Sequence, residues 1–167
     1  MKQSGKVFNA IHKAEEICLI YGEQLLQDPI IAILIEKYKK AIDATGNLFK
    51  KIGVIDACHI CAQKNHGSCC FEGMENNYTP VLLLINMLMG VELPHKREHQ
   101  SHCFFVGSGG CKLMARYHFC VNYFCPDLEK AMGKDKLNSL LTVVGEEIFA
   151  GWELEKSIYN FLQKTNP

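Results

Sequence analysis

Apolar side chains recur every three or four residues over two long stretches of this chain, a spacing that is typical of amphipathic helices. The first stretch runs from about residue 5 to residue 55, and Asp28-Pro29 divides it in two. Asp favours the N-cap of a helix and Pro its first turn, so one helix is predicted to end near Gln27 and another to follow. We therefore expect a helical hairpin over residues 5–55, with apolar positions at Val7, Ile11, Ala14, Cys18, Tyr21, Leu25, Ile31, Leu34, Tyr38, Ile42, Leu48 and Ile52.

The second stretch, over residues 127–164, shows the same spacing and predicts C-terminal helices. Gly151 lies inside it, at a point where a helix could break or kink. The acidic residues Asp135, Glu146 and Glu147 fall on faces that the pattern predicts to be solvated. The apolar positions are Leu137, Leu141, Val144, Ile148, Trp152, Ile158 and Phe161.

Residues 57–126, between these stretches, show little regular periodicity and are punctuated by glycines. One further helix is predicted from Thr79-Pro80 to Gly90, with threonine as N-cap and glycine as stop signal. The segments that begin at Cys103 and Cys111 flank a turn, residues 107–110, that is rich enough in glycine for positive φ. This pattern predicts a short β-hairpin that brings Cys103 and Cys111 close together.

Length and composition place these elements in one domain. The chain has 167 residues, of which 48% are hydrophobic and 22% charged, and 18 Lys and Arg balance 18 Asp and Glu. Such values are ordinary for a globular protein with a real core, and the neutral charge argues against a polybasic nucleic-acid binder. We expect a mainly α, single-domain fold over residues 1–167: the hairpin, a cysteine-rich metal-binding core over residues 57–126, and the C-terminal helices.

The apolar runs are too short for a membrane span. The longest, over residues 81–91, is interrupted by Asn86 and falls well short of the ~20 residues that a transmembrane helix needs. Residues 1–13 lack the uninterrupted apolar stretch of a signal peptide. We therefore expect a cytoplasmic protein that binds neither membranes nor nucleic acid, in a compartment that keeps thiols reduced.

Cysteine is the exceptional feature of the composition. Cys18 lies alone on the first apolar stripe, where it is expected to pack as a small apolar residue. The other eight of the nine cysteines fall between residues 58 and 125. In a reducing compartment such a cluster more often holds metal than disulfides, and the odd total also argues against full pairing. The predicted metal-binding and cofactor-binding residues are Cys58, Cys61, Cys69, Cys70, Cys103, Cys111, Cys120 and Cys125.

The spacing of these cysteines fits several metal centres. Cys58-x2-Cys61 is the local unit in which two thiolates grip one metal. The adjacent Cys69 and Cys70 are expected to point in different directions, and so to serve different sites or to divide between binding and packing. Eight thiols could hold two four-cysteine zinc sites, two iron–sulfur clusters of the 4Fe–4S kind, or one cluster with thiols to spare.

Residues near the cysteines bear on the choice between zinc and an iron–sulfur cluster. Zinc also accepts histidine, and His95-x3-His99 has the spacing that places two imidazoles on one helix face. An iron–sulfur cluster prefers thiolates in an apolar pocket, and six aromatic residues beside the cysteines could exclude water, so we favour this cofactor. The histidines are His59, His66, His95, His99, His102 and His118, and the aromatic residues are Phe71, Phe104, Phe105, Phe119, Tyr123 and Phe124.

The cysteine pattern resembles that of the YkgJ-like family of zinc- or iron-chelating proteins. Cys58-His-Ile-Cys61 and Cys69-Cys70 are similar to the first half of the family pattern, C-x2-C-x2-C-C, with seven residues in place of two. The second half is matched by Cys103-Phe-Phe-Val, Cys111-Lys-Leu-Met-Ala-Arg116, Cys120 and Phe124-Cys125-Pro126, where Cys125 is an addition. The resemblance covers roughly residues 58–126 and implies that the matched cysteines are ligands.

These observations lead to a metal-binding protein, and we interpret it first as an iron–sulfur protein with an electron-transfer or redox-sensing role. The alternative is a zinc module that stabilises an interaction scaffold, and a second alternative is a cluster-dependent transferase, because related patterns occur in flagellin lysine methylases. The chain has no G-x-G-x-x-G, phosphate-loop, G-x-S-x-G or H-E-x-x-H motif, and no catalytic residue is assigned. The expected partner class is a redox partner protein; the sequence does not indicate an oligomeric state.

Overall fold

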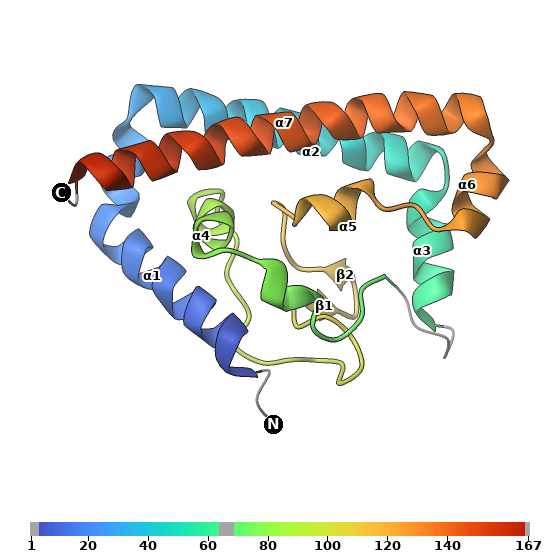
Figure 1. Cartoon of the computed structure of the whole chain (residues 1–167), viewed down its shortest axis with the longest axis horizontal. Coiled ribbons are helices and arrows are strands. Elements are labelled where there is room, and N and C mark those ends of the chain that lie inside the picture. Colours follow the sequence, from blue (N-terminus) through green and yellow to red (C-terminus); the bar gives the residue numbers. More distant parts are fainter. Residues whose placement is uncertain (1–3, 64–68, 166–167) are drawn as a thin grey trace.

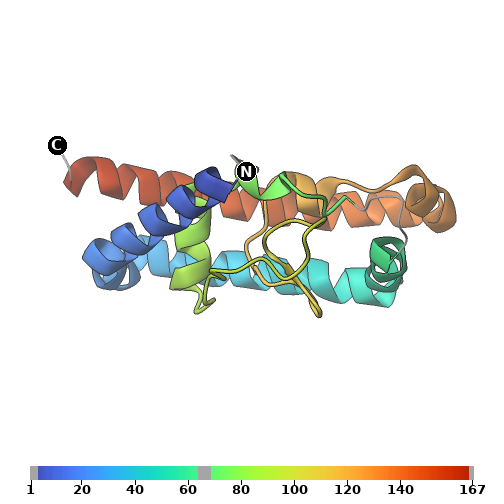
Figure 2. The same ribbon diagram turned by 90° about the horizontal axis from the view of Figure 1, so that it is seen from below.

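The structure, a computed structural model, describes residues 4–63 and 69–165, and the side chains of residues 5–60 and 69–165. Two long helices, α2 and α7, run antiparallel along the longest dimension, and the other elements lie along one side of them (Figures 1 and 2). The predicted mainly α fold is confirmed. The elements are α1 (Ser4–Gln27), α2 (Pro29–Lys51), α3 (Val54–Gln63), a 3-10 turn η1 (Met74–Asn77), α4 (Pro80–Leu88), β1 (Val106–Gly107), β2 (Gly110–Cys111), α5 (His118–Asn122), α6 (Pro126–Met132) and α7 (Lys134–Thr165).

The junction of α1 and α2 has the predicted capping but not the predicted geometry. The Asp28 carboxylate accepts hydrogen bonds from the backbone N–H of Ile30 and Ile31, at 2.9 and 3.0 Å, and Pro29 opens α2. The chain bends by 95° between the two helices, so they are not antiparallel. The prediction of a helical hairpin over residues 5–55 is therefore wrong. A single residue separates the helices, whereas an antiparallel pair needs a loop of two to five residues. No single helix in the described part of the chain has the length and apolar character to cross a membrane, although the bent pair α1 and α2 together meets that test.

Helices α2 and α7 approach closely where Gly151 meets Tyr38. A Cβ added at Gly151 would lie 2.9 Å from Cζ of the Tyr38 ring, closer than a real Cβ can sit. The glycine therefore leaves room for the buried tyrosine instead of breaking α7, which is continuous from Lys134 to Thr165. The predicted interruption at Gly151 does not occur.

Helices α1, α2, α4 and α7, which we call the helical frame, enclose the main apolar core. Fully buried residues of this core include Ile11 and Leu25 of α1, Leu84 of α4 and Leu154 of α7. Helix α4 begins as predicted, because the Thr79 hydroxyl accepts a hydrogen bond from the backbone N–H of Leu82 at 3.1 Å. A second apolar cluster lies at the other end of α2, around Phe49, Val54, Val121, Phe124, Leu128, Leu140 and Val144.

One acidic residue of α7 contradicts its predicted environment. Asp135 and Glu146 are exposed as expected, but only 1% of Glu147 is exposed. Successive helical residues are about 100° apart around the axis, so neighbouring glutamates can face solvent and protein respectively. The prediction that Glu147 lies on a solvated face is therefore wrong.

Candidate metal centre

Among the described side chains, the predicted cysteines include five that lie close enough for one thiol to shift the pKa of another. They come from four short segments of the region between α3 and α6. The backbone N–H of Cys103 donates a hydrogen bond to the carbonyl of Cys70 at 2.8 Å, and a β-bridge joins the next residues, Phe71 and His102. We call this set the thiol cluster: Cys69, Cys70, Cys103, Cys111 and Cys120.

The predicted hairpin is confirmed and accounts for the place of Cys111. Strands β1 and β2 pair antiparallel, with Val106 opposite Cys111, and Gly110 has the positive φ that the turn requires (+102°). Cys103 lies three residues before β1, and the charge of Cys111 contributes to raising its pKa. The hairpin therefore places Cys111 within electrostatic reach of Cys103.

Glu75 fixes the segment that carries Cys103. This carboxylate is 1% exposed and accepts hydrogen bonds from the backbone N–H of Gly73, at 2.9 Å, and of Phe104, at 3.3 Å. It also pairs with the guanidinium of Arg97, which donates a further hydrogen bond to the carbonyl of His102. The chain on both sides of Cys103 is therefore held by one buried, charge-assisted network.

Asn86 fixes the segment between Cys111 and Cys120 by hydrogen bonds, as Glu75 fixes the segment that carries Cys103. Its side-chain oxygen accepts from the backbone N–H of Met114 and Ala115, at 2.9 and 3.0 Å. Its amide nitrogen donates to the carbonyls of Ala115 and Leu82, both at 2.9 Å. The residue is fully buried; three of these bonds attach the segment after the hairpin to α4, the fourth stays within α4, and no polar atom of the Asn86 side chain is left unpaired.

The vicinal pair Cys69 and Cys70 does not diverge as predicted. The two thiols are close enough to interact: the Cys70 thiol lowers the pKa of Cys69, and the Cys69 thiol, together with burial, raises the pKa of Cys70. The charges of Cys69, Cys111 and Cys120 raise the pKa of Cys70 further. One proton shared by two adjacent sulfurs is the physical basis of this opposite pair of shifts.

The remaining members of the cluster are held as thiols by their surroundings. Burial raises the pKa of Cys103 to about 12, and the charges of Glu75, Cys111 and Cys120 act in the same direction. Burial also raises the pKa of Cys120, whereas the Tyr78 hydroxyl, which donates to its sulfur at 3.9 Å, lowers it. A bound cation would favour the thiolate forms by offsetting both burial and mutual repulsion.

The other predicted ligands are not among the five thiols of the cluster, or their side chains lie outside the described residues. Cys58 is exposed on α3, and the side chain of Cys61 and all of His66 lie outside the described residues. Cys125 precedes α6 and packs against the second apolar cluster. Cys18 packs against the main core as expected, and burial raises its pKa.

Two further expectations about neighbouring residues change with the structure. His95 and His99 do not share a helix face, because their segment is not helical: His95 lies 3.2 Å from the Glu15 carboxylate and His99 packs on the ring of His102. Of the six aromatic residues, the buried ones are Phe104, Phe105 and Phe124, whereas Phe71, Phe119 and Tyr123 are 48%, 36% and 43% exposed. Only three of the six aromatic residues that were expected to exclude water from the cysteines are therefore buried.

Within the described residues, no three or more His, Cys, Asp or Glu side chains are arranged so that they could hold a metal ion. The structure collects thiols in one region but does not present them as a finished ligand set. Zinc and iron–sulfur ligation at these residues therefore remain predictions.

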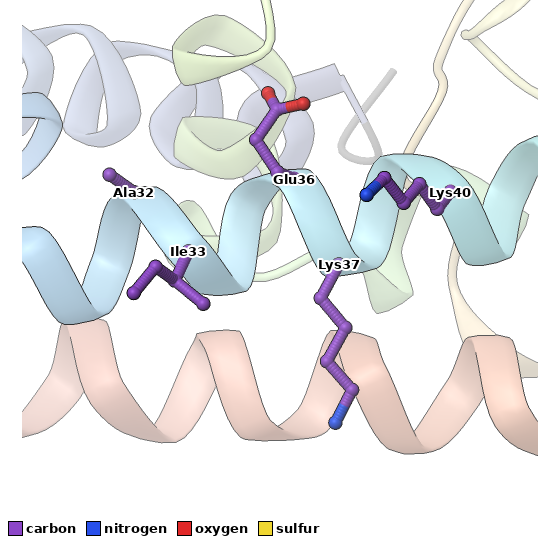
Figure 3. A pocket seen from close by; sticks show the side chains of 5 residues that line it. All are labelled: Ala32, Ile33, Glu36, Lys37 and Lys40. Atoms are coloured by element: carbon purple, nitrogen blue, oxygen red, sulfur yellow. The ribbon is translucent and has the colours of Figure 1, made fainter.

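Two pockets on the described surface are candidate binding sites; we call them the larger and the smaller hollow. The larger, of about 550 Å³, is formed by Ala32, Ile33, Glu36, Lys37 and Lys40 of α2. Figure 3 shows these five side chains spread along one helix and pointing in different directions. Ligand sites gather polar groups from several elements, so this hollow offers little specific chemistry. The smaller hollow, of about 300 Å³, gathers titratable side chains from α2, α7 and the segment before α5.

The chain matches no protein-family model, no curated protein and no solved structure. The resemblance to the YkgJ-like family therefore stays a prediction based on the cysteine pattern.

Proposed function

We propose that this chain binds a metal centre through the thiol cluster, and that the centre is an iron–sulfur cluster with an electron-transfer or redox-sensing role. The observation that carries the proposal is the convergence of Cys69, Cys70, Cys103, Cys111 and Cys120 from segments up to 51 positions apart in the sequence. Burial alone does not require several thiols at one place, whereas an iron–sulfur cluster needs four thiolate ligands, and five thiols are gathered here.

The character of the gathered groups favours iron–sulfur over a mixed cysteine and histidine zinc site. The groups that shift one another's pKa are thiols, and His95 and His99 pair with Glu15 and His102 instead. The Tyr78 hydroxyl that donates to the Cys120 sulfur is of the kind that tunes the potential of a cluster. These contacts support all-thiolate ligation.

Metal binding would require local rearrangement of side chains. The five sulfurs are not yet disposed as ligands, but rotation about χ1 moves a cysteine sulfur without moving its backbone. Cys69 and Cys111 are exposed, so their side chains have room to rotate. The backbone positions, in contrast, are already fixed by the hydrogen bonds of Glu75 and Asn86.

The experiment is purification without oxygen, followed by measurement of iron, acid-labile sulfide and zinc per chain. We expect iron and sulfide in comparable amounts, with visible absorption that bleaches when dithionite supplies an electron. Stoichiometric zinc without sulfide or colour would replace the redox role with the structural zinc module, because zinc is redox-silent. Protein that retains neither metal would overturn the proposal.

A further inference from the structure

The smaller hollow is a pocket of about 300 Å³ between α2, α7 and the chain around the start of α5. Two carboxyl groups of α7, Glu147 and Glu155, line it. Its walls also include three aromatic side chains, Tyr38, Tyr117 and Trp152. A pocket with a few convergent polar groups and aromatic walls has the general make-up of a site for a small ligand.

Glu147 is the feature of this pocket that requires an explanation. It is 1% exposed, and neither of its carboxylate oxygens makes a hydrogen bond of good geometry with any described group. The Thr45 hydroxyl lies close enough to lower the pKa of the carboxyl, yet this hydroxyl also lacks a well-formed hydrogen bond. A buried carboxylate without a partner costs several times more than a paired one, so a missing partner is implied.

Arg116 does not supply that partner. Its guanidinium also lines the pocket but lies over the Phe49 ring, 5.9 Å from the centroid, and forms no ion pair with Glu147 in the described structure. Its charge lowers the pKa of Glu147 only from a distance, while burial raises it. Burial raises the pKa of Glu155 as well, so the pocket holds two carboxyl groups that lack close compensation.

The missing partner is best matched by an organic cation. An ammonium group donates hydrogen bonds to a carboxylate and, when it lies on an aromatic face, is attracted by the ring. Trp152, which is 53% exposed, places such a face in the same pocket as Glu147 and Glu155, and the Lys156 ammonium lies 4.9 Å from the centroid of its ring. An anionic ligand would instead meet two carboxyl groups, with Arg116 and His118 as its only basic contacts among the lining residues.

We propose that this pocket binds the ammonium group of an organic amine, such as a lysine side chain or a small alkylamine, with Glu147 as the counter-ion. This inference does not depend on a metal at the thiol cluster. Glu155, which also lines the pocket, would add a second, more exposed negative charge.

The experiment uses the full chain and N-acetyl-lysine methylamide as the probe, at constant pH and ionic strength. N-acetyl-norleucine methylamide, which lacks the ammonium group, is the matched control ligand. Calorimetry measures affinity, and fluorescence locates the ligand, because Trp152 is the single tryptophan of the chain and lines the pocket. We expect saturable binding of the lysine probe with a change in Trp152 emission, and at least about tenfold weaker binding of the control.

Variants assign the binding to Glu147. Glu147→Gln keeps the shape of the side chain but removes its charge, and we expect an affinity loss of at least about tenfold. Glu146→Gln, at the exposed neighbouring position, should bind like the wild type. Glu155→Gln provides a second test of the pocket should Glu147→Gln not fold, and we expect a loss of about threefold, because this carboxyl is more exposed.

Three results would overturn the inference. The first is absence of saturable binding of the lysine probe by the wild type, and the second is equal binding of the norleucine control. The third is wild-type affinity in Glu147→Gln, or in Glu155→Gln where only that variant folds. Because none of these measurements involves metal, failure here would leave the proposed function untouched.

Discussion

The helical frame and the loops that carry the thiol cluster are stabilised by different interactions. The frame buries apolar side chains such as Ile11, Leu84 and Leu154, each with no exposed surface. The loops depend on buried hydrogen-bonding groups, chiefly Glu75, which pairs with Arg97, and Asn86, which reaches them from α4. Contacts between apolar side chains have no preferred direction, whereas hydrogen bonds and ion pairs fix particular atoms at particular distances.

This difference indicates a division of labour. The frame supplies the bulk of the buried apolar surface, and the polar groups determine where the backbone of Cys103, Cys111 and Cys120 lies. Replacing even one of these few polar residues should therefore disturb the backbone positions of the thiol cluster.

Replacing Arg97 by methionine should have the largest effect. It would leave the buried Glu75 carboxylate without its cation, and breaking a buried pair in this way costs about 3–5 kcal/mol of unfolding free energy. Denaturant unfolding measures this loss. Lys96→Met, at the exposed neighbouring position, should change stability by less than about 0.5 kcal/mol. Equal unfolding midpoints for the two variants would show that the ion pair does not hold the loop.

Asn86→Ala should rank next. It removes four hydrogen bonds and leaves the backbone N–H groups of Met114 and Ala115 without acceptors, so we expect a loss of about 3 kcal/mol. Asn160→Ala, at an exposed position of α7, is the control and should be nearly neutral. Hydrogen exchange at residues 114 and 115 should accelerate in Asn86→Ala only. Unchanged protection there would contradict the role given to Asn86.

Two glycines of α7 test packing within the frame. Gly151→Ala would place a methyl group against the Tyr38 ring and should destabilise the protein by about 1–3 kcal/mol. Gly145→Ala meets open space in the same helix and should stabilise it by up to about 1 kcal/mol. Thermal melting of the two variants should therefore show shifts of opposite sign. Shifts of the same sign would mean that the contact between Gly151 and the Tyr38 ring does not limit how closely α2 and α7 approach each other.

The smallest expected effect is a pH dependence due to Glu147. Burial raises its pKa in the folded state above the unfolded value of about 4.3, so the folded state holds the proton more tightly. Stability should therefore fall as pH rises from about 4.3 through the raised pKa, and then level off. Thr45 and Arg116 face the same carboxyl and reduce the shift. Glu147→Gln should lessen this fall, while Glu146→Gln should follow the wild type; identical curves for both variants would contradict the assignment.

Local signals in the sequence predicted most of the helices. The caps at Asp28 and Thr79 act within their own first turn, and the positive φ of Gly110 belongs to its own hairpin. The direction of the chain after α1 was not predictable from the same signals. It depends on how α1 packs against α4, a contact between residues far apart in the sequence.

The candidate site was predictable only in outline. A spacing of four residues suggested a helix for His95 and His99, but tertiary contacts hold that segment in a loop. The pattern around Glu146 and Glu147 could not distinguish the exposed glutamate from the buried one, because helix rotation depends on the partner helix. The gathering of the thiol cluster likewise depends on Glu75 and Asn86, whose partners lie about 30 residues along the chain.

The central claim is that the thiol cluster holds one metal centre, and the most direct test is metal per chain in single serine variants prepared without oxygen. Cys103→Ser and Cys120→Ser, both inside the cluster, are compared with Cys18→Ser, which packs against the main core. We expect iron and labile sulfide to fall sharply in the first two variants and to stay at the wild-type level in the third. Wild-type metal content in a Cys103→Ser, Cys120→Ser double variant that remains folded by circular dichroism would contradict it.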